Sequence, residues 1–331
     1  MNNLKTVVAP AFIALLAMVC GVMAFTLDSY SLLVFTLCAL AAVVGVGLNI
    51  LIGLSGQISF GHIAFYAIGA YVSALLSMAG WTLWLALPMA GAVAGLIGAL
   101  LAIPALRVSG PYLAMITIAF AFVVHHGLIE WRDVTGGSNG LMGIPLPEFA
   151  DLDPAILLAL LAAALMIGAL LFYRRLSQSG WGKAMRAVKT SEIAARSLGF
   201  NPVISKTLAF ALSAALTGLA GGLLAPLLMF INPESFPFPQ SILFVLAVIV
   251  GGSGMLFGPL IGAVLIVLVP ELLSDFAEYR LLIFSLLLLI VLWIAPNGLL
   301  GALARRLIKP VRLLPPTSID QARMAAHLRS R

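Results

Sequence analysis

Apolar stretches of about 20 residues recur along most of this chain and constrain its fold more than any other feature. Such a stretch is long enough to cross the hydrocarbon core of a bilayer as an α-helix, and helices satisfy their own backbone hydrogen bonds there. The chain is 62% hydrophobic and 9% charged, whereas ordinary soluble domains are roughly 25% charged. The sequence therefore predicts an all-α, polytopic helical membrane protein.

We predict about ten transmembrane spans within one membrane domain, residues 1–304. The predicted spans are 7–27, 30–52, 62–79, 82–104, 111–129, 154–173, 207–230, 240–250, 259–273 and 281–295. Residues 305–331 form a basic, proline-containing tail, which we expect to be disordered in the cytoplasm.

Two long polar loops differ in charge and predict the orientation. Loop 174–206 has seven basic residues, Arg174, Arg175, Lys183, Arg186, Lys189, Arg196 and Lys206, and one acid, Glu192. Loop 131–153 has four acids, Asp133, Glu148, Asp151 and Asp153, and one base, Arg132. Because Lys and Arg are retained on the cytoplasmic side, loop 174–206 is predicted to be cytoplasmic and loop 131–153 external. Both termini are then cytoplasmic.

The cytoplasmic loop contains an amphipathic helical pattern. Small and apolar residues share one stripe: Ala184, Ala187, Val188, Ser191, Ala194, Ala195 and Leu198. Basic residues lie on the other side, and Gly199 is placed to end the helix in a left-handed conformation. Ser191 marks a point where the segment can divide into two helices. The stripe suits either an anionic membrane surface or a protein groove, and its shallow alanine face favours the protein groove.

Two glycine-rich breaks, 53–62 and 251–259, interrupt the apolar runs. Both contain Ser-Gly followed by Phe-Gly, so they are candidates for an internal repeat built on glycine-broken helices.

Several segments together resemble a known transporter family. EIAARSLG at 192–199 resembles the cytoplasmic loop of ABC importer permeases, in which paired alanines precede a glycine by four positions. Further segments resemble branched-chain amino-acid permeases of the LivM and LivH type, namely GLNILIGLSGQISFGH at 47–62, GPY at 110–112, TGGSNG at 135–140, GGSG with FGP within 251–259, and PNGLLG at 296–301. Loop 131–153 favours the LivM type. Met255 and Leu256 depart from the polar character expected at the second break, and the tail is longer than the core fold needs.

The resemblance implies a permease subunit of an ATP-driven importer for leucine, isoleucine and valine in the bacterial plasma (inner) membrane. The implied partners are a homologous LivH-type permease, one or two cytoplasmic ATP-binding subunits, an external amino-acid-binding protein and the lipid bilayer. ATP and Mg²⁺ are expected in the partner subunits, because the chain has no Gly-x-x-x-x-Gly-Lys-[Ser/Thr] loop. No enzymatic activity, cofactor, metal or nucleic-acid partner is expected for this chain.

Three sets of residues are candidates for these contacts. The predicted contacts with an ATPase are Ala184, Ala187, Val188, Glu192, Ala194, Ala195, Leu198 and Gly199. The predicted substrate path includes Asn49, Ser55, Gln57, Ser59, His62 and Ser253. The predicted docking surface for the binding protein includes Asp133, Ser138, Asn139 and Asp151. If the first break does not line the substrate path, it is a cytoplasmic turn. If the glycine run at 135–140 does not contact the binding protein, it is a structural loop tip.

Alternative functions remain open at this point. Relatives of this type also carry urea, short amides or other amino acids. An ion-coupled secondary transporter normally has charged residues in mid-membrane, and here Glu130 and Glu271 lie near outer ends. His126 and Glu130 are four residues apart and are expected to form a surface hydrogen bond rather than a metal site. The sequence contains no nucleophile and base at motif spacing, so nothing in it indicates a membrane-embedded enzyme.

Overall fold

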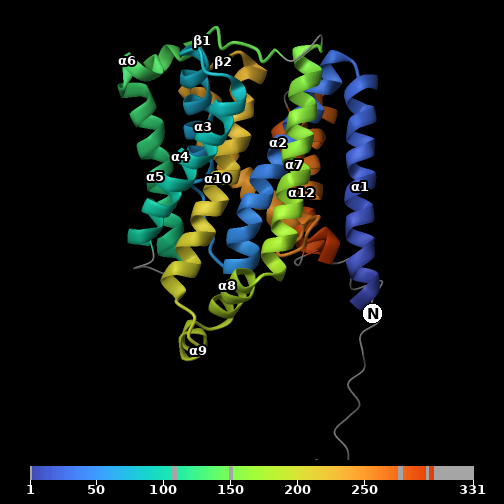
Figure 1. Cartoon of the computed structure of the whole chain (residues 1–331), viewed down its shortest axis with the longest axis vertical. Coiled ribbons are helices and arrows are strands. Elements are labelled where there is room, and N and C mark those ends of the chain that lie inside the picture. Colours follow the sequence, from blue (N-terminus) through green and yellow to red (C-terminus); the bar gives the residue numbers. More distant parts are fainter. Residues whose placement is uncertain (1, 106–109, 149–151, 275–278, 296–297, 302–331) are drawn as a thin grey trace, which may run out of the picture.

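The computed structural model describes residues 2–105, 110–148, 152–274, 279–295 and 298–301, which form a bundle of roughly aligned helices (Figure 1). The long helices are α1 (Asn2–Thr26), α2 (Ser29–Asn49), α3 (His62–Met78), α4 (Leu83–Ala105), α5 (Pro111–Glu130), α7 (Pro154–Gln178), α10 (Pro202–Leu228), α11 (Phe238–Gly251), α12 (Gly258–Leu272) and α13 (Arg280–Ile294). Each predicted span coincides with one of these helices. Asp151 and the predicted tail, 305–331, lie outside the described residues.

Six helical stretches in the described part are long and apolar enough to cross a membrane, and four shorter apolar helices accompany them. The prediction of an all-α, polytopic membrane protein is therefore confirmed. The number of helices that cross the bilayer stays a prediction.

The helices begin where the sequence supplies N-terminal caps. The Asp153 carboxylate accepts a hydrogen bond from the Ala155 amide at 2.8 Å, and the Asn201 side chain accepts one from the Val203 amide at 2.9 Å. Asp28 caps α2 in the same way. A proline follows Asp153 and Asn201 directly, at a position where its missing N–H is not needed.

The core lies around α2 and α10. Helix α2 packs against α7, α10 and α12, and α10 packs against α3 and α4. Glycines bring α3 and α10 into backbone contact, since a Cβ on Gly221 would lie 2.0 Å from the Tyr66 carbonyl oxygen and a Cβ on Gly69 would lie 2.1 Å from the Gly218 carbonyl oxygen. Small residues at helix interfaces permit such approaches in membranes.

The two ends of the bundle carry different short elements. One end has the start of α1 together with α8 (Gly180–Thr190) and α9 (Glu192–Ser197), and the other has α6 (Arg132–Thr135) and two short strands (Figure 1). The strands β1 (Leu141–Met142) and β2 (Phe230–Ile231) pair antiparallel, with Leu141 opposite Ile231. The remaining short elements are η1 (Ile50–Ser55), η2 (Gly137–Asn139) and η3 (Pro233–Ser235).

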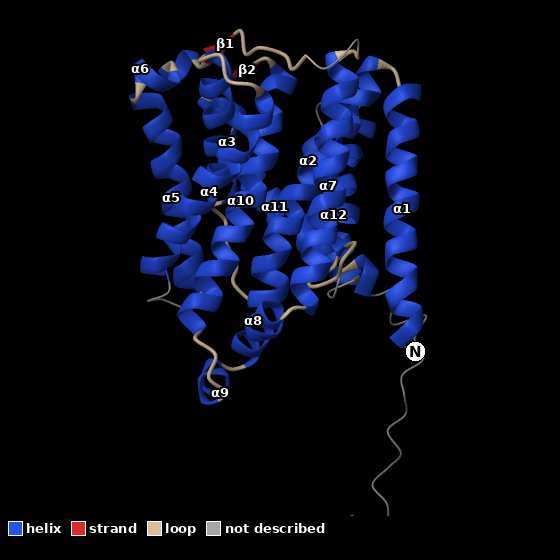
Figure 2. Cartoon of the chain, viewed as in Figure 1, coloured by secondary structure: helices blue, strands red, loops and turns tan. Residues whose placement is uncertain are grey.

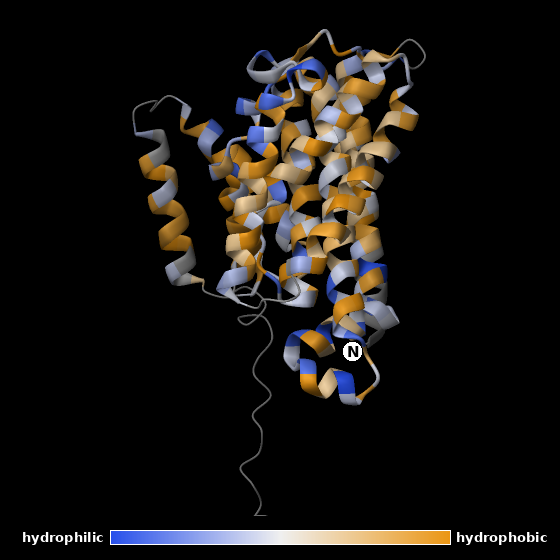
Figure 3. Cartoon of the chain, turned by 90° about the vertical axis from the view of Figure 1, so that its left-hand side faces the viewer, coloured by the Kyte–Doolittle hydropathy of each residue, from blue (hydrophilic) through white to orange (hydrophobic). Residues whose placement is uncertain are grey.

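Loops and hydrophilic residues gather at these two ends, while the helices between them are largely apolar (Figures 2 and 3). The basic loop and the acidic loop lie at opposite ends of the bundle, as the charge pattern predicts (Figure 1). We refer to the end with α8 and α9 as the cytoplasmic end and to the other as the outer end.

The two glycine-rich breaks have different backbone forms. The first is an extended run over residues 56–61 that follows the π-helical turn η1. The second, over residues 252–257, is a compact turn between α11 and α12 in which Gly252 and Gly254 have φ angles of 117° and 82°. Their conformations therefore give no support to an internal repeat.

Candidate functional site

The extended run over residues 56–61 enters the bundle from its cytoplasmic end. It begins beside α8, because Lys189 of α8 contacts the carbonyls of Ile52 and Gly53. It ends at His62, whose ring lies against Ser213, eleven residues after the start of α10 at Pro202. At 1.5 Å per residue this contact lies about 16 Å along α10. The break is thus a re-entrant segment rather than a turn at the surface.

Side chains from two helices satisfy the non-helical backbone of this segment, and a side chain from a third contacts the His62 ring at its end. The Phe60 amide donates to Thr117 Oγ1 of α5 at 3.0 Å, and the Ser241 hydroxyl of α11 donates to the Phe60 carbonyl at 2.5 Å. The His62 Nε2 lies 2.7 Å from Ser213 Oγ of α10. Irregular backbone at membrane depth is tolerated where protein groups satisfy it. These polar residues therefore hold the segment in place.

The structure does not support a substrate path along Ser59 and His62. Both side chains are 0% exposed. Ser59 Oγ accepts a hydrogen bond from the Gly61 amide at 3.3 Å, and His62 is engaged by Ser213. These residues are enclosed by their own chain, and their contacts stabilise the start of α3.

Asn49 joins the two glycine-rich breaks. Its Nδ2 donates to the Met255 carbonyl at 2.9 Å, and its Oδ1 accepts from the Gly254 amide at 2.6 Å. A Cβ on Gly53 would lie 2.7 Å from the Gly254 nitrogen, so a glycine is needed for this approach. The prediction that Asn49 lines a substrate path is not supported, because both ends of its amide are occupied by the second break. Ser253 lies exposed beside this contact.

The cytoplasmic loop forms two helices that divide at Ser191. The Ser179 hydroxyl caps α8 by accepting from the Gly182 amide at 3.3 Å, and the Ser191 hydroxyl caps α9 by accepting from the Ala194 amide at 3.3 Å. Helix α9 ends at Ser197, and Gly199 follows the Leu198 cap in the predicted left-handed conformation, with a φ of 82°. Two hydrogen bonds complete this end, Gly199 N to Arg196 O at 2.9 Å and Phe200 N to Ala195 O at 3.0 Å, which is the Schellman arrangement.

Three residues of the alanine-rich stripe pack against the chain's own helices. Ala184, Val188 and Ala195 are 4%, 3% and 1% exposed, and α8 contacts η1, α7 and α10. These three side chains are therefore covered by this chain's own helices, which argues against a direct contact with an ATPase, and their role in coupling stays a prediction. Ala187 is half-buried and Ala194, Leu198 and Gly199 are exposed.

Lys189 links α8 to the end of α2, a role that the sequence analysis missed. Its Nζ donates to the carbonyls of Ile52 at 3.0 Å and Gly53 at 2.9 Å. These carbonyls belong to the last turn of η1, where a cation also complements the helix dipole. The residue as a whole is exposed, but its ammonium is partly buried, and desolvation lowers the pKa of Lys189 from its ordinary value.

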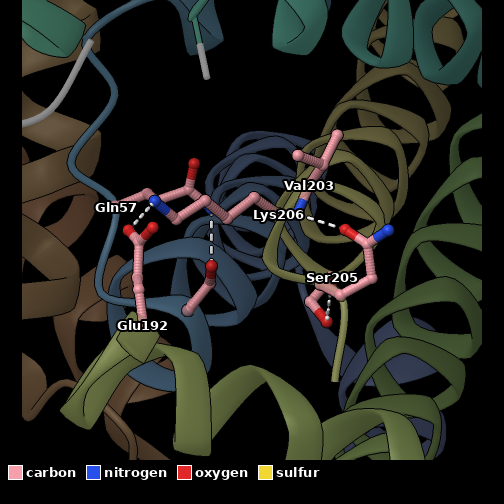
Figure 4. A network of polar contacts seen from close by, with 7 residues as sticks. Gln57, Glu192, Val203, Ser205 and Lys206 are labelled. Atoms are coloured by element: carbon pink, nitrogen blue, oxygen red, sulfur yellow. Dashed lines mark hydrogen bonds and ion pairs between the residues drawn. The ribbon is translucent and has the colours of Figure 1, made fainter. Parts of the chain in front are cut away.

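A cavity of about 440 Å³ opens beside Lys189 at the cytoplasmic end. Its walls come from η1 and the extended run, the start of α5, the α8–α9 pair and α10, and they include Ser55, Gln57, Glu192 and Lys206. The Glu192 carboxylate and the Lys206 ammonium form an ion pair, and Figure 4 shows them meeting beside Gln57. The Gln57 Nε2 donates to Ser55 Oγ at 2.5 Å. Of the residues predicted to form the substrate path, Ser55 and Gln57 line this cavity.

Comparison with known proteins decides the family. A sequence profile described as "Branched-chain amino acid transport system / permease component" matches residues 29–294. The chain belongs to this family. The resemblance to branched-chain amino-acid permeases in the sequence is thereby confirmed. No solved structure matches the chain significantly.

Curated relatives of this permease are named as branched-chain amino acid permeases. The high-affinity branched-chain amino acid transport system permease protein LivM of Salmonella typhimurium strain LT2 is 36% identical over 323 residues, covering 89% of this chain and 76% of the relative. The LivM protein of Escherichia coli strain K12 is 38% identical over 292 residues, covering 80% and 68%. The LivH protein of Escherichia coli strain K12 is 27% identical over 291 residues, covering 80% and 92%.

The permease exposes large apolar side chains at its α8–α9 end. Ile193 and Leu198 are 82% and 72% exposed, and Phe200 and Val203 continue the same area. An open hollow of about 320 Å³ lies at the turn from α9 to α10, next to Gly199 and Phe200. Ile193 lies two residues before the buried Ala195, on the opposite side of α9. Ile193 is a large aliphatic residue on the otherwise polar side of the helix, and this was the feature of the sequence that could have predicted the exposed surface.

The outer loop of the permease presents the predicted polar residues. Asp133, Ser138 and Asn139 are exposed, at the end of the bundle away from α8 and α9 (Figure 1). His125 lies 3.7 Å from Glu234 across the loop, whereas a hydrogen bond between His126 and Glu130 was expected. In the part of the chain that the structure describes, no group of three or more His, Cys, Asp or Glu residues could hold a metal ion.

Proposed function

We propose that this permease is the membrane-spanning subunit of an ATP-driven importer for leucine, isoleucine and valine in the bacterial plasma membrane. The observation that carries the proposal is the α8–α9 pair, which projects at the cytoplasmic end and is bonded through Lys189 to the Ile52 and Gly53 carbonyls, at the start of the first glycine-rich break. A projecting helix pair that is bonded to the bundle can transmit the movement of a separate ATP-binding subunit to the membrane-spanning helices. The family and the names of the relatives support the substrate class.

The exposed apolar surface that runs from α9 to the start of α10 is the proposed contact with that subunit. We define this docking face as Ile193, Leu198, Phe200 and Val203, which are all exposed. Phe200 and Val203 line the hollow beside α9. Exposed apolar side chains of this kind are typical of interface anchors. Movement of α9 would be carried into α8, which contacts η1 and α10.

The other proposed partners are inferred from the family and from the residues exposed at the outer end of the bundle. A homologous LivH-type permease is the proposed second membrane subunit, because relatives of both types match this chain. The proposed docking surface for an external amino-acid-binding protein includes Asp133, Ser138 and Asn139 on the outer loop. ATP and Mg²⁺ belong to the ATP-binding subunits.

Uptake into proteoliposomes tests the function. The permease, a LivH-type partner and the ATP-binding subunits of the same genome are reconstituted together, and the binding protein is added outside. Labelled leucine is expected to accumulate only with ATP inside, and isoleucine and valine to compete with it. Urea and short amides are expected not to compete. Accumulation driven by a proton or sodium gradient without ATP would contradict the proposal.

Ile193→Asp is expected to release the ATP-binding subunit from the purified complex. Truncating a central interface anchor commonly costs about 2 kcal/mol or more, so we expect co-purified ATPase to fall by about tenfold or more. Val134→Asp is the matched control, because Val134 is 40% exposed at the outer end. Equal recovery of ATPase with both variants would remove α9 from the interface.

A further inference from the structure

The cavity at the cytoplasmic end has an organised charged wall. Lys189 and Lys206 supply two cations and Glu192 supplies one anion, all among the lining residues. Each is held in place: Lys189 bonds the carbonyls of Ile52 and Gly53, and Glu192 pairs with Lys206. The Lys206 side chain is 14% exposed and that of Glu192 is 42% exposed, and both line the cavity. A small ligand carrying both signs of charge matches this wall.

The rest of the lining is largely apolar. It includes Phe60 of the extended run, Leu113 and Ala114 of α5, and also Ile58 and Val188. A volume of about 440 Å³ lies within the range of about 300–1,000 Å³ that is usual for small-molecule sites. The combination of an apolar wall and a charged wall excludes inorganic ions and purely apolar ligands as good fits.

We propose that this cavity binds a zwitterionic α-amino acid with an apolar side chain, entering from the cytoplasm. The carboxylate of the ligand contacts Lys206, its ammonium contacts Glu192, and its side chain lies against Phe60 and Leu113. The ligand thus replaces the Glu192–Lys206 pair by two charge-assisted contacts of the same kind. The site rests on the proposed function only for the expectation that leucine, isoleucine and valine are the amino acids bound.

Occupation of the site has a consequence for the α8–α9 pair. Glu192 is the first residue of α9 and Lys206 lies in the first turns of α10. A ligand between these two residues separates α9 from α10 and contacts the re-entrant segment, which lines the same cavity. Internal amino acid is therefore expected to inhibit the transporter from the cytoplasmic side.

Equilibrium binding of labelled L-leucine to the purified complex, without binding protein or nucleotide, tests the site. Unlabelled L-leucine is expected to compete fully. We expect 4-methylpentanoate, which lacks the ammonium, and 3-methylbutylamine, which lacks the carboxylate, to compete about tenfold more weakly or worse, because each loses a charge-assisted contact. Competition by either analogue that is as strong as that of unlabelled L-leucine would overturn the zwitterion site.

Variants locate the binding. Glu192→Gln and Lys206→Met are each expected to weaken leucine binding by about tenfold or more. Lys183→Met is the control, because Lys183 is exposed on α8 and does not line the cavity. Unchanged leucine binding in both cavity variants, or no binding to the native complex, would overturn the proposal. Elution of each complex as one species shows that it is folded.

Failure here is distinguishable from failure of the proposed function. Uptake with loaded binding protein outside and no amino acid inside does not require this site. ATP-driven leucine uptake together with absent leucine binding at the cavity would remove the site and leave the importer intact.

Discussion

Gly221→Leu is expected to prevent accumulation of folded permease in the membrane. A Cβ at this position would lie 2.0 Å from the Tyr66 carbonyl oxygen and 3.1 Å from the Ala70 amide nitrogen. Both atoms belong to the backbone of α3, so relief requires α3 and α10 to separate along their contact. Overpacking costs of about 3 kcal/mol or more follow from such shifts. Size-exclusion chromatography of a fluorescent fusion measures the folded fraction.

A glycine without neighbours provides the control. Gly168 lies on the exposed side of α7, and a Cβ there would meet nothing within 4 Å. Gly168→Leu is expected to elute as the native protein does. If Gly221→Leu also elutes normally and in native amounts, α3 and α10 do not pack as described.

The apolar runs were sufficient to predict the helices, because each run is bounded by residues that act locally. Asp153 and Asn201 cap helices from the preceding position, and Gly199 ends α9 through its own backbone. Such local signals can be read within a few residues. The placement of the basic and acidic loops at opposite ends of the bundle was equally predictable, because it depends on the balance of charge in two loops.

Local signals in the sequence could not predict how far the first break lies inside the bundle. Counting residues placed 56–61 near the cytoplasmic surface, but the partners that hold it inside the bundle are distant in sequence. Thr117 is 57 residues from Phe60, and Ser213 is 151 residues from His62. A polar, glycine-rich stretch in a membrane protein looks the same whether solvent or distant hydroxyls satisfy its backbone.

The cytoplasmic stripe shows a second limit. Periodicity correctly grouped Ala184, Val188 and Ala195 on one face, but it could not tell what covers that face. The structure covers it with this chain's own helices, and the free apolar surface lies at Ile193 and Leu198. Small residues suited the close approach of α8 to the bundle rather than a groove in a partner.

Lys189→Met is expected to separate ATP hydrolysis from transport. The change removes both hydrogen bonds to the Ile52 and Gly53 carbonyls while keeping a side chain of similar length. The docking face on α9 is untouched, so the ATP-binding subunit stays attached and continues to hydrolyse ATP. Helix α8 then loses its bond to η1, and through it to the contact between Gly53 and Gly254. Leucine taken up per ATP is expected to fall by about tenfold, corresponding to about 1.4 kcal/mol of lost coupling.

Two variants distinguish Lys189 as a positioning residue from a general need for positive charge on α8. Lys189→Arg retains donors that can reach the same carbonyls and is expected to recover most of the uptake per ATP. Lys183→Met removes a charge from the exposed side of α8 and is expected to leave the ratio unchanged. A parallel fall of ATP hydrolysis and uptake in Lys189→Met would assign Lys189 to attachment of the motor instead. An unchanged ratio would show that α8 moves the bundle through its packing on α7 and α10 and not through this bond.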